Sequence, residues 1–309
     1  MALKLRLCAA YAVASLVLLS GCNAYLSTKT ASGFTPNVQT KAHIRSWALP
    51  ESKHDTLLYI SDFYGVHVYS YPSGTLVGEL EDFQSPAGLC SDKAGNVFVT
   101  DTEAQKVYEF AHGGTQPIAT LYDNYASFNA FACSVDRATK TLAVTSADSN
   151  DVFLFKDEAG SPIIYKNPYA FGYFCTYDGS GNLFTRGTDN HIAELSKGST
   201  SFTNIKLSER VHDIVGFAWD GNYLSINGNS PSNVNYRVQV NGRKATIVSK
   251  ASLLQAKFVV QFTLYNHQLI GPDQNANRVS FWKYPKATNP VKTIGELELP
   301  EGSTISLGH

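Results

Sequence analysis

Charged residues are scarce in this sequence of 309 residues, and neither sign is in excess. Lys and Arg total 25, Asp and Glu total 26, and charged residues make up 17% of the chain. A protein that binds nucleic acid through its phosphates needs a basic surface. The composition therefore excludes nucleic acid as an electrostatically bound partner. After residue 21, no run is long and apolar enough to span a membrane.

The residue patterns of common catalytic and metal sites are also missing. The 8 histidines show no metal-ligand spacing. The chain has neither a serine in a nucleophile elbow nor a phosphate-binding loop. The sequence therefore offers no catalytic set and requires no cofactor, and a divalent cation such as calcium is the open alternative.

The amino-terminal residues have the features of a bacterial export signal. A basic start precedes an apolar run that ends near Leu19, and this run is too short to span a bilayer permanently. The sequence Leu19-Ser20-Gly21-Cys22 follows and resembles the lipobox of bacterial lipoproteins. The resemblance implies that residues 1–21 are removed and that Cys22 becomes acylated. An ordinary secretory peptide with a chance cysteine is the alternative.

The chain after the lipobox predicts a tether followed by one domain. Residues 22–43 are rich in Ser, Thr, Ala and Asn, which suits a flexible tether. Residues 44–309 suffice for one closed β domain. Asn23 stands where an aspartate would signal retention in the inner membrane. We therefore expect a lipid-anchored monomer in the outer membrane, facing the periplasm.

One sequence motif recurs about every 40 residues along the predicted domain. It is clearest from Ser85 to Asp101, where a tight turn joins two short strands. The aspartate of this turn recurs, and its carboxylate can cap the backbone amides of the turn. The recurring positions are Asp92, Asp136, Asp178 and Asp220.

A β-rich repeat of this length predicts a propeller. Five copies are visible between Pro86 and Leu297, and a sixth is split between the two ends of the domain. Residues 299–307 would complete the copy that starts at Leu57, which leaves no open sheet edge around the ring. The expected fold is therefore all-β: a six-bladed β-propeller whose C-terminal strand joins the N-terminal blade.

The copy from Ser85 to Phe110 resembles an NHL repeat. It has a Pro-x-Gly start, an Asp-x-x-Gly-Asn turn, a Val-Phe-Val-Thr-Asp strand and a Val-Tyr-Glu-Phe strand. Propellers of this family bind proteins, RNA or small ligands, and their relatives include lactonases and lyases. The resemblance implies a ligand over the central channel, at the end that carries the loops between second and third strands.

Those loops carry a repeated acid or amide. A ring of such groups could hold a hard cation such as calcium or grip the hydroxyls of a sugar. Alternatively, each side chain caps its own hairpin. The six residues are Asp62, Asp101, Asp148, Asp189, Asn229 and Asp273.

Residues near the starts of the innermost strands are further candidates for ligand contacts. Aromatic rings there suit sugars or flat ligands, but they also suit packing between blades. The few polar groups match no lactonase metal set. The candidates are Phe131, Tyr169, Phe171, Tyr173, Asn129, His212, Asp213 and Glu301.

Three cysteines fall at equivalent points on successive inner strands: Cys90, Cys133 and Cys175. In an oxidising periplasm two of them could form a disulfide. Three thiolates could instead bind a soft metal, or each cysteine could serve as a small apolar side chain.

Two functions from different classes follow. The first is a non-catalytic module that binds a glycan, peptide or protein partner at the channel mouth. The second is a metal-dependent hydrolase, or a lactonase-like or lyase-like enzyme, with its site in the central channel.

Overall fold

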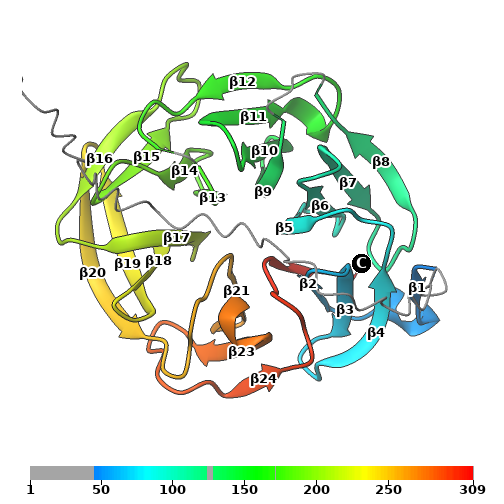
Figure 1. Cartoon of the computed structure of the whole chain (residues 1–309). Helices are drawn as coiled ribbons and strands as arrows, with labels where there is room; N and C mark the ends of the chain where they lie inside the picture. The colour runs from blue at the N-terminus through cyan, green and yellow to red at the C-terminus, as the bar shows by residue number, and fades with distance from the viewer. Residues whose placement is uncertain (1–44, 124–127, 171, 309) are drawn as a thin grey trace, which may run out of the picture. The chain divides into compact units, whose positions relative to one another are not determined.

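The computed structural model describes residues 45–123, 128–170 and 172–308 (Figure 1). The predicted signal peptide, Cys22 and tether lie outside these ranges, as does the candidate Phe171. The described part contains no α-helix, only short 3-10 helices. None of these is long and apolar enough to cross a membrane. The short 3-10 helices are η1 (Pro50–Lys53), η2 (Lys156–Glu158) and η3 (Gln274–Ala276).

The strands form successive antiparallel units, five-stranded in the first and four-stranded in the others, which we number 1 to 6 along the chain. Unit 1 contains β2 (Leu57–Ser61), β3 (Val66–Ser70) and β4 (Thr75–Leu80), flanked by β1 (Trp47–Ala48) and by β25 (Ser303–Ser306). Unit 2 contains β5 (Pro86–Ser91), β6 (Val97–Asp101), β7 (Lys106–Phe110) and β8 (Pro117–Leu121). Unit 3 contains β9 (Ala130–Asp136), β10 (Thr141–Ser146), β11 (Asp151–Phe155) and β12 (Ile163–Lys166).

The second half of the domain repeats this plan. Unit 4 contains β13 (Cys175–Tyr177), β14 (Leu183–Arg186), β15 (His191–Leu195) and β16 (Thr203–Leu207). Unit 5 contains β17 (His212–Trp219), β18 (Leu224–Ser230), β19 (Val234–Asn241) and β20 (Lys244–Ser252). Unit 6 contains β21 (Thr263–Tyr265), β22 (Gln268–Asp273), β23 (Arg278–Lys283) and β24 (Lys292–Ile294).

Units 4 and 5 share one sheet of 8 strands, because β16 and β20 pair in parallel at their outer edges. The units surround a central opening in chain order, and the first strand of each lies nearest the centre (Figure 1). This arrangement is a β-propeller, so the predicted all-β class is confirmed.

The two ends of the domain meet in unit 1, as the split repeat predicts. β25 pairs antiparallel with β2, with Leu57 opposite Ser306 and Ile60 opposite Ser303. The amide of Ser61 donates to the carbonyl of Gly302 over 3.1 Å. The C-terminal strand therefore occupies the innermost place of the first unit and closes the ring.

The hydrophobic core lies mainly between neighbouring units. Every residue of β2, β5 and β6 is buried. Phe98 of unit 2 belongs to the same apolar cluster as Phe128 and Phe153, which precede or lie in unit 3. The last two rings pack edge to face with their centroids 4.8 Å apart. Burying one such ring contributes about 1.5–3 kcal/mol, so contacts between sheets stabilise the ring of units.

Buried hydroxyls near the ends of the second strands link units 1, 2 and 3 each to the next unit. The hydroxyl of Thr100 donates to the carbonyl of Phe131 over 2.8 Å. The hydroxyl of Thr145 donates in the same way to Tyr173 over 3.0 Å, and Ser61 donates to Ala87. These bonds explain why a small hydroxyl residue recurs there: it satisfies a buried carbonyl of the neighbouring strand.

The turn aspartates cap their hairpins, as the sequence pattern predicts. The Asp92 carboxylate accepts from the amide of Asn96 over 2.7 Å, and that of Asp178 accepts from Asn182 over 2.9 Å. Gly95, in the turn between Asp92 and Asn96, adopts a φ of +87°, which only glycine adopts without strain.

Candidate functional site

The propeller has two different ends, which we name by their connections. The turn face carries the hairpins between first and second strands, and the loop face carries the loops between second and third strands. The family resemblance places ligands at the loop face. In the structure, the cavity to which all six units contribute is at the turn face.

That cavity has a volume of about 430 Å³ and follows the central channel. It is lined by the first strand of every unit and by several of the turns after those strands. Six hydroxyl residues and four aromatic residues contribute to the wall. The hydroxyl residues are Ser91, Ser134, Thr176, Thr263, Ser303 and Thr304, and the aromatic residues are Tyr177, Phe217, Trp219 and Phe262.

A glutamine side chain crosses the channel beside this cavity. The amide group of Gln261 donates to the carbonyl of Leu89 and accepts from its backbone amide, both over 2.9 Å. Gln261 lies just before β21, whereas Leu89 lies in β5, so this pair connects units 6 and 2. Gln261 is a polar residue just before a strand whose neighbours are apolar. That contrast is the one sequence signal that could have identified Gln261 as a residue of the channel.

Arg137 supplies a positive charge at the mouth of the cavity. Its side chain is exposed, and Nη2 donates to the hydroxyl of Ser91 over 3.1 Å. Ser91 donates in turn to the carbonyl of Ile305 over 2.8 Å. A guanidinium has five N–H donors, so Arg137 can contact Ser91 and still present donors to an anionic ligand.

Tyr177 contributes a polar group to the same wall. Its hydroxyl oxygen is buried and has no hydrogen-bond partner among the described residues. Burial, together with the nearby Cys175 and Asp136, raises the pKa of the phenol well above its usual value, so the group is a neutral donor. Tyr177 was not predicted from the sequence, because an aromatic residue at the end of a strand is typical of packing between sheets.

The cysteine row lies beside the cavity, and two of its members are bonded. Cys90 of β5 and Cys133 of β9 form a disulfide with a Cα–Cα distance of 5.7 Å. Cys175 is a buried free thiol, and burial raises its pKa to about 12. Of the alternatives left open by the sequence, the structure contains the disulfide, and a site of three thiolates is excluded while that bond is intact.

Three of the repeated acids of the loop face are buried. Asp101 and Asp273 are completely buried, and Asp62 is 2% exposed. Asp101 accepts from the amides of Gln84 and Ser85, over 2.9 and 2.8 Å. Hairpin and segment capping therefore accounts for these three carboxylates, and a ligand-binding ring of all six positions stays a prediction.

The same three carboxylates hold the segments that lead into the first strands of their units. Asp273 accepts from Lys257 and Phe258, and Asp62 accepts from Glu298. In each case the donors precede the first strand of the same unit. Asp62 and Asp101 also cap their own loops, since they accept from the amides of Gly65 and Ala104, which extends the capping interpretation.

His67 faces the Asp62 carboxylate in unit 1. Its Nε2 lies 3.0 Å from Asp62 Oδ2, and its Nδ1 lies 3.4 Å from Glu79 Oε1. Burial lowers the pKa of His67, but the two carboxylates outweigh burial and raise that pKa above its usual value. The Asp62 pKa is raised by burial and lowered more strongly by His67 and the amides, so it lies below its usual value.

The remaining members of the predicted acid and amide set are more accessible. Asp148 and Asp189 are exposed, and Asn229 is partly buried. The Asn229 amide donates to the carbonyl of Val259 over 3.1 Å. Asp148 accepts from the amide of Asn129, which is another of the predicted candidates.

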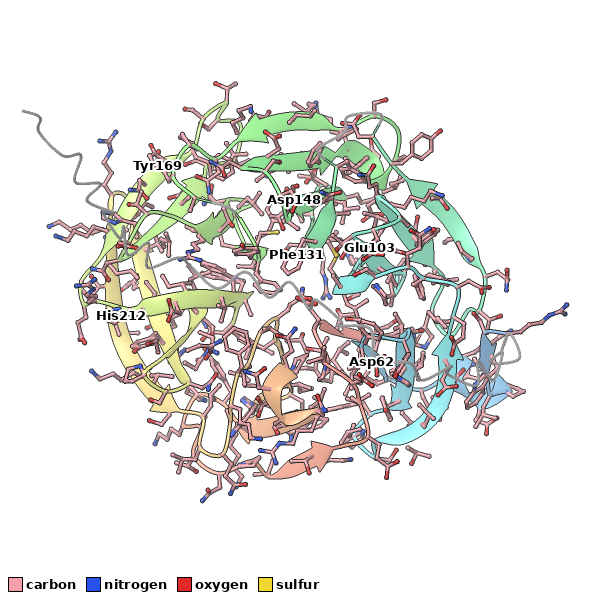
Figure 2. The ribbon with its side chains drawn as sticks, in the orientation of Figure 1. Asp62, Glu103, Phe131, Asp148, Tyr169 and His212 are labelled. Atoms are coloured by element: carbon pink, nitrogen blue, oxygen red, sulfur yellow. A yellow bond between two sulfur atoms is a disulfide. The ribbon has the colours of Figure 1, made fainter. Side chains whose placement is uncertain are left out.

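The predicted ligand residues separate into several places. Phe131 lies beside the central opening, whereas Tyr169 and His212 lie towards the rim (Figure 2). Phe131 packs against Tyr173 with ring centroids 5.5 Å apart. The hydroxyl of Tyr169 donates to the carbonyl of Phe202 over 3.3 Å, so this ring has a structural role.

A small pocket at the loop face brings three of the predicted residues together. Its volume is about 110 Å³, and it is lined by Asp189, His212 and Asp213, with Arg186 and Arg210 also in the wall. This volume suits a small ion or water rather than a sugar ring.

Glu301 lies between β24 and β25, next to the closing strand. Its backbone amide donates to the carbonyl of Ser61 over 3.0 Å, and its side chain is half-buried. Burial raises the pKa of the carboxyl to about 7.

A cluster of three acids lies elsewhere on the turn face. Carboxylate oxygens of Asp92, Glu109 and Glu158 lie within 4.8 Å of one another. Asp92 and Glu109 are buried, and Glu158 is half-buried with its Oε1 atom buried. Burial and the charge of Asp92 raise the pKa of Glu109, and burial with both neighbouring acids raises that of Glu158 to about 7. The sequence contains no signal for this cluster, because Glu158 belongs to a different unit.

No protein-family model matches the sequence, and no curated protein matches it. Solved structures do resemble the chain. One chain in a crystal structure of a nidogen/laminin complex has a TM-score of 0.66 and 14% identity, covering 82% of this chain and 99% of that one. A Bacteroides caccae protein of unknown function has a TM-score of 0.61 and 9% identity, with the same coverage. Apo AztD from Citrobacter koseri has a TM-score of 0.52 and 11% identity, again covering 82% and 99%. At these identities the likeness shows the β-propeller fold alone.

Proposed function

We propose that this protein is a lipid-anchored bacterial envelope protein whose propeller binds a ligand in the channel cavity at the turn face. In this proposal the domain is a six-bladed propeller of the NHL-repeat type. The sheet of 8 strands counts as two blades joined at their outer edges. The observation that supports a binding role is the convergence of all six first strands on one cavity of about 430 Å³.

The cavity wall indicates the chemistry of the ligand. Pockets for small molecules typically measure about 300–1,000 Å³, and this cavity falls in that range. Its hydroxyls suit a polar ligand, the Trp219 and Tyr177 rings offer apolar faces, and Arg137 suits a carboxylate. We propose the end of a glycan or peptide chain that carries a carboxylate, without a chemical step.

A hydrolytic role has less support from this cavity. The acids in its wall are Asp136 and Asp178. Asp136 accepts from the amide of Ala138 over 3.0 Å and from the Thr139 hydroxyl over 2.6 Å. Asp178 caps its own turn, so both carboxylates serve the hairpins. We therefore favour binding over the metal-dependent hydrolase.

The proposed anchor rests on the lipobox-like residues that end at Cys22. Two acyl signals give stable membrane binding, since each buried methylene contributes about 0.8 kcal/mol. We expect radiolabelled palmitate to be incorporated into the wild-type chain, which should fractionate with the outer membrane. Replacing Cys22 by alanine should abolish the label and release the protein, and a variant that still fractionates with membranes would contradict the anchor.

A thermal-shift screen tests the binding site. Free ligand at about 100 times its Kd stabilises the native state by about 2.7 kcal/mol. Acidic oligosaccharides and short peptides with free carboxyl ends are the compounds to screen. We expect at least one class to raise the Tm of the wild-type chain.

Matched arginine variants then locate the site. Arg137→Gln should remove most of the ligand-dependent shift, because it deletes the cation at the turn-face cavity. Arg210→Gln changes an exposed arginine at the loop-face pocket and should keep the shift. The opposite pattern would place the ligand at the loop face and refute the proposed site.

A further inference from the structure

Three carboxylates meet on the turn face, away from the channel cavity: those of the buried Asp92 and Glu109 and that of the half-buried Glu158. Asp92 follows β5, Glu109 lies in β7, and Glu158 ends η2 in the connection between β11 and β12. Two of the acids thus come from unit 2 and the third from unit 3. Their oxygens all lie within 4.8 Å of one another.

Such an arrangement is unfavourable without a cation at its centre. Like charges at this distance repel, and burial removes the water that would screen them. Lys140 is the cation whose charge acts on both Glu109 and Glu158. One lysine against three carboxylates leaves an excess of negative charge in the cluster.

One carboxylate oxygen of the cluster accepts no hydrogen bond from the described residues. The Asn96 amide nitrogen donates to Asp92 Oδ2 over 3.1 Å and to Glu109 Oε1 over 2.8 Å, which fixes both carboxylates. Glu158 Oε1 is buried and has no hydrogen-bond partner among the described residues. This oxygen can therefore accept from water or bind a cation.

Unit 4 contains the same local pattern without the third acid. The Asn182 amide nitrogen donates to Asp178 Oδ2 over 2.9 Å, as Asn96 does to Asp92. Glu194 takes the place of Glu109 but accepts from the hydroxyl of Ser196 over 2.9 Å. Among the described residues, the cluster in unit 2 is the one group of three such acids. The turn chemistry of the repeat therefore does not account for Glu158.

We propose that Asp92, Glu109 and Glu158 bind a divalent cation that prefers oxygen ligands, with calcium as the best fit. Calcium binds carboxylate oxygens at about 2.3–2.6 Å, so oxygens on opposite sides of the ion lie about 5 Å apart. Three carboxylates meet this spacing, and water completes the coordination. The ion links units 2 and 3 on the turn face, and this proposal does not rest on ligand binding in the channel.

Calorimetric titration of the full, chelator-treated chain with calcium chloride tests the proposal. We expect binding with a Kd of about 10⁻³ M or tighter and a higher Tm in calcium. The variant Glu158→Gln should weaken binding by at least about tenfold, equal to about 1.4 kcal/mol. Glu109→Gln should weaken it similarly, and the control Glu194→Gln in unit 4 should leave it unchanged.

The calcium-free proteins give an independent readout that does not depend on affinity. Removing the repulsion should give Glu158→Gln a higher Tm than wild type in chelator, and it should lose the calcium-dependent rise. Absence of heat and of any Tm rise at about 10 mM calcium would overturn the proposal. Equal weakening by Glu158→Gln and Glu194→Gln would overturn it as well, because the ion would then bind elsewhere.

Discussion

Reducing the disulfide between Cys90 and Cys133 should destabilise the propeller strongly. The bond joins the first strands of units 2 and 3, and the two cysteines are 43 residues apart. Chain-entropy theory gives about 4 kcal/mol for a closed loop of this length, because the crosslink restricts the unfolded chain. For a domain of this size, such a loss corresponds to a Tm lower by about 8–16 °C.

The location of the bond makes this magnitude testable without creating a cavity. Both cysteines are buried, and reduction removes no heavy atom, although the two sulfurs must move apart to van der Waals contact. No cavity is created, so the loss comes mainly from the covalent link. The wild-type chain should be unfolded, reduced and refolded under reducing conditions, and its thermal unfolding compared with that of the oxidised protein.

Cys175 provides the matched control, since it is a buried sulfur in the next inner strand without a covalent partner. Cys175→Ala should lower the free energy of unfolding by about 1 kcal/mol, as a small cavity would. Peptide mapping after alkylation should modify Cys90 and Cys133 only once the protein has been reduced. Equal losses for reduction and for Cys175→Ala, or ready alkylation of all three thiols without reductant, would refute the reasoning.

Three further predictions concern titratable groups. Asp101→Ala should destabilise the fold by about 1–3 kcal/mol because buried amides lose their acceptor, while the exposed Asp189→Ala should change stability by less than about 0.5 kcal/mol; urea unfolding distinguishes them. The raised pKa of His67 means that its ion pair with Asp62 stabilises fully below about pH 6.5 and less as the pH rises through the raised value. His67→Gln should therefore lose its stability deficit relative to wild type on going to alkaline pH, and a constant deficit would contradict this. Because burial raises the pKa of Glu301 to about 7, its ionisation costs stability as the pH rises from about 4.5 to 7; Glu301→Gln should be more stable than wild type at pH 8 and equal to it in acid.

The fold was largely predictable because its determinants are local and repeated. Each hairpin carries its own aspartate and glycine, as at Asp92 and Gly95, and these residues act within a few positions of the chain. The split copy at the two ends predicted the pairing of β2 with β25, because only a closed ring satisfies both edge strands.

The candidate site was less predictable because cavities depend on side chains from different units. The loop-face acids looked like ligands in the sequence, yet Asp101 is consumed by backbone amides. Arg137 directly follows the turn aspartate Asp136 in the sequence, yet its side chain lines the channel cavity and contacts Ser91. The position of a cavity along the channel depends on the sizes of the inward-facing side chains of all the units. The sequence of one repeat therefore does not predict it.

The sequence alone determined the propeller, its closure and the capping role of the turn aspartates, since those follow from interactions within a hairpin or between equivalent strands. Only the tertiary structure decided which two cysteines are bonded, which face holds the cavity, and that Glu158 meets Asp92 and Glu109. The physical reason is that these contacts join different units, at separations set by the ring and by side-chain packing rather than by the repeat.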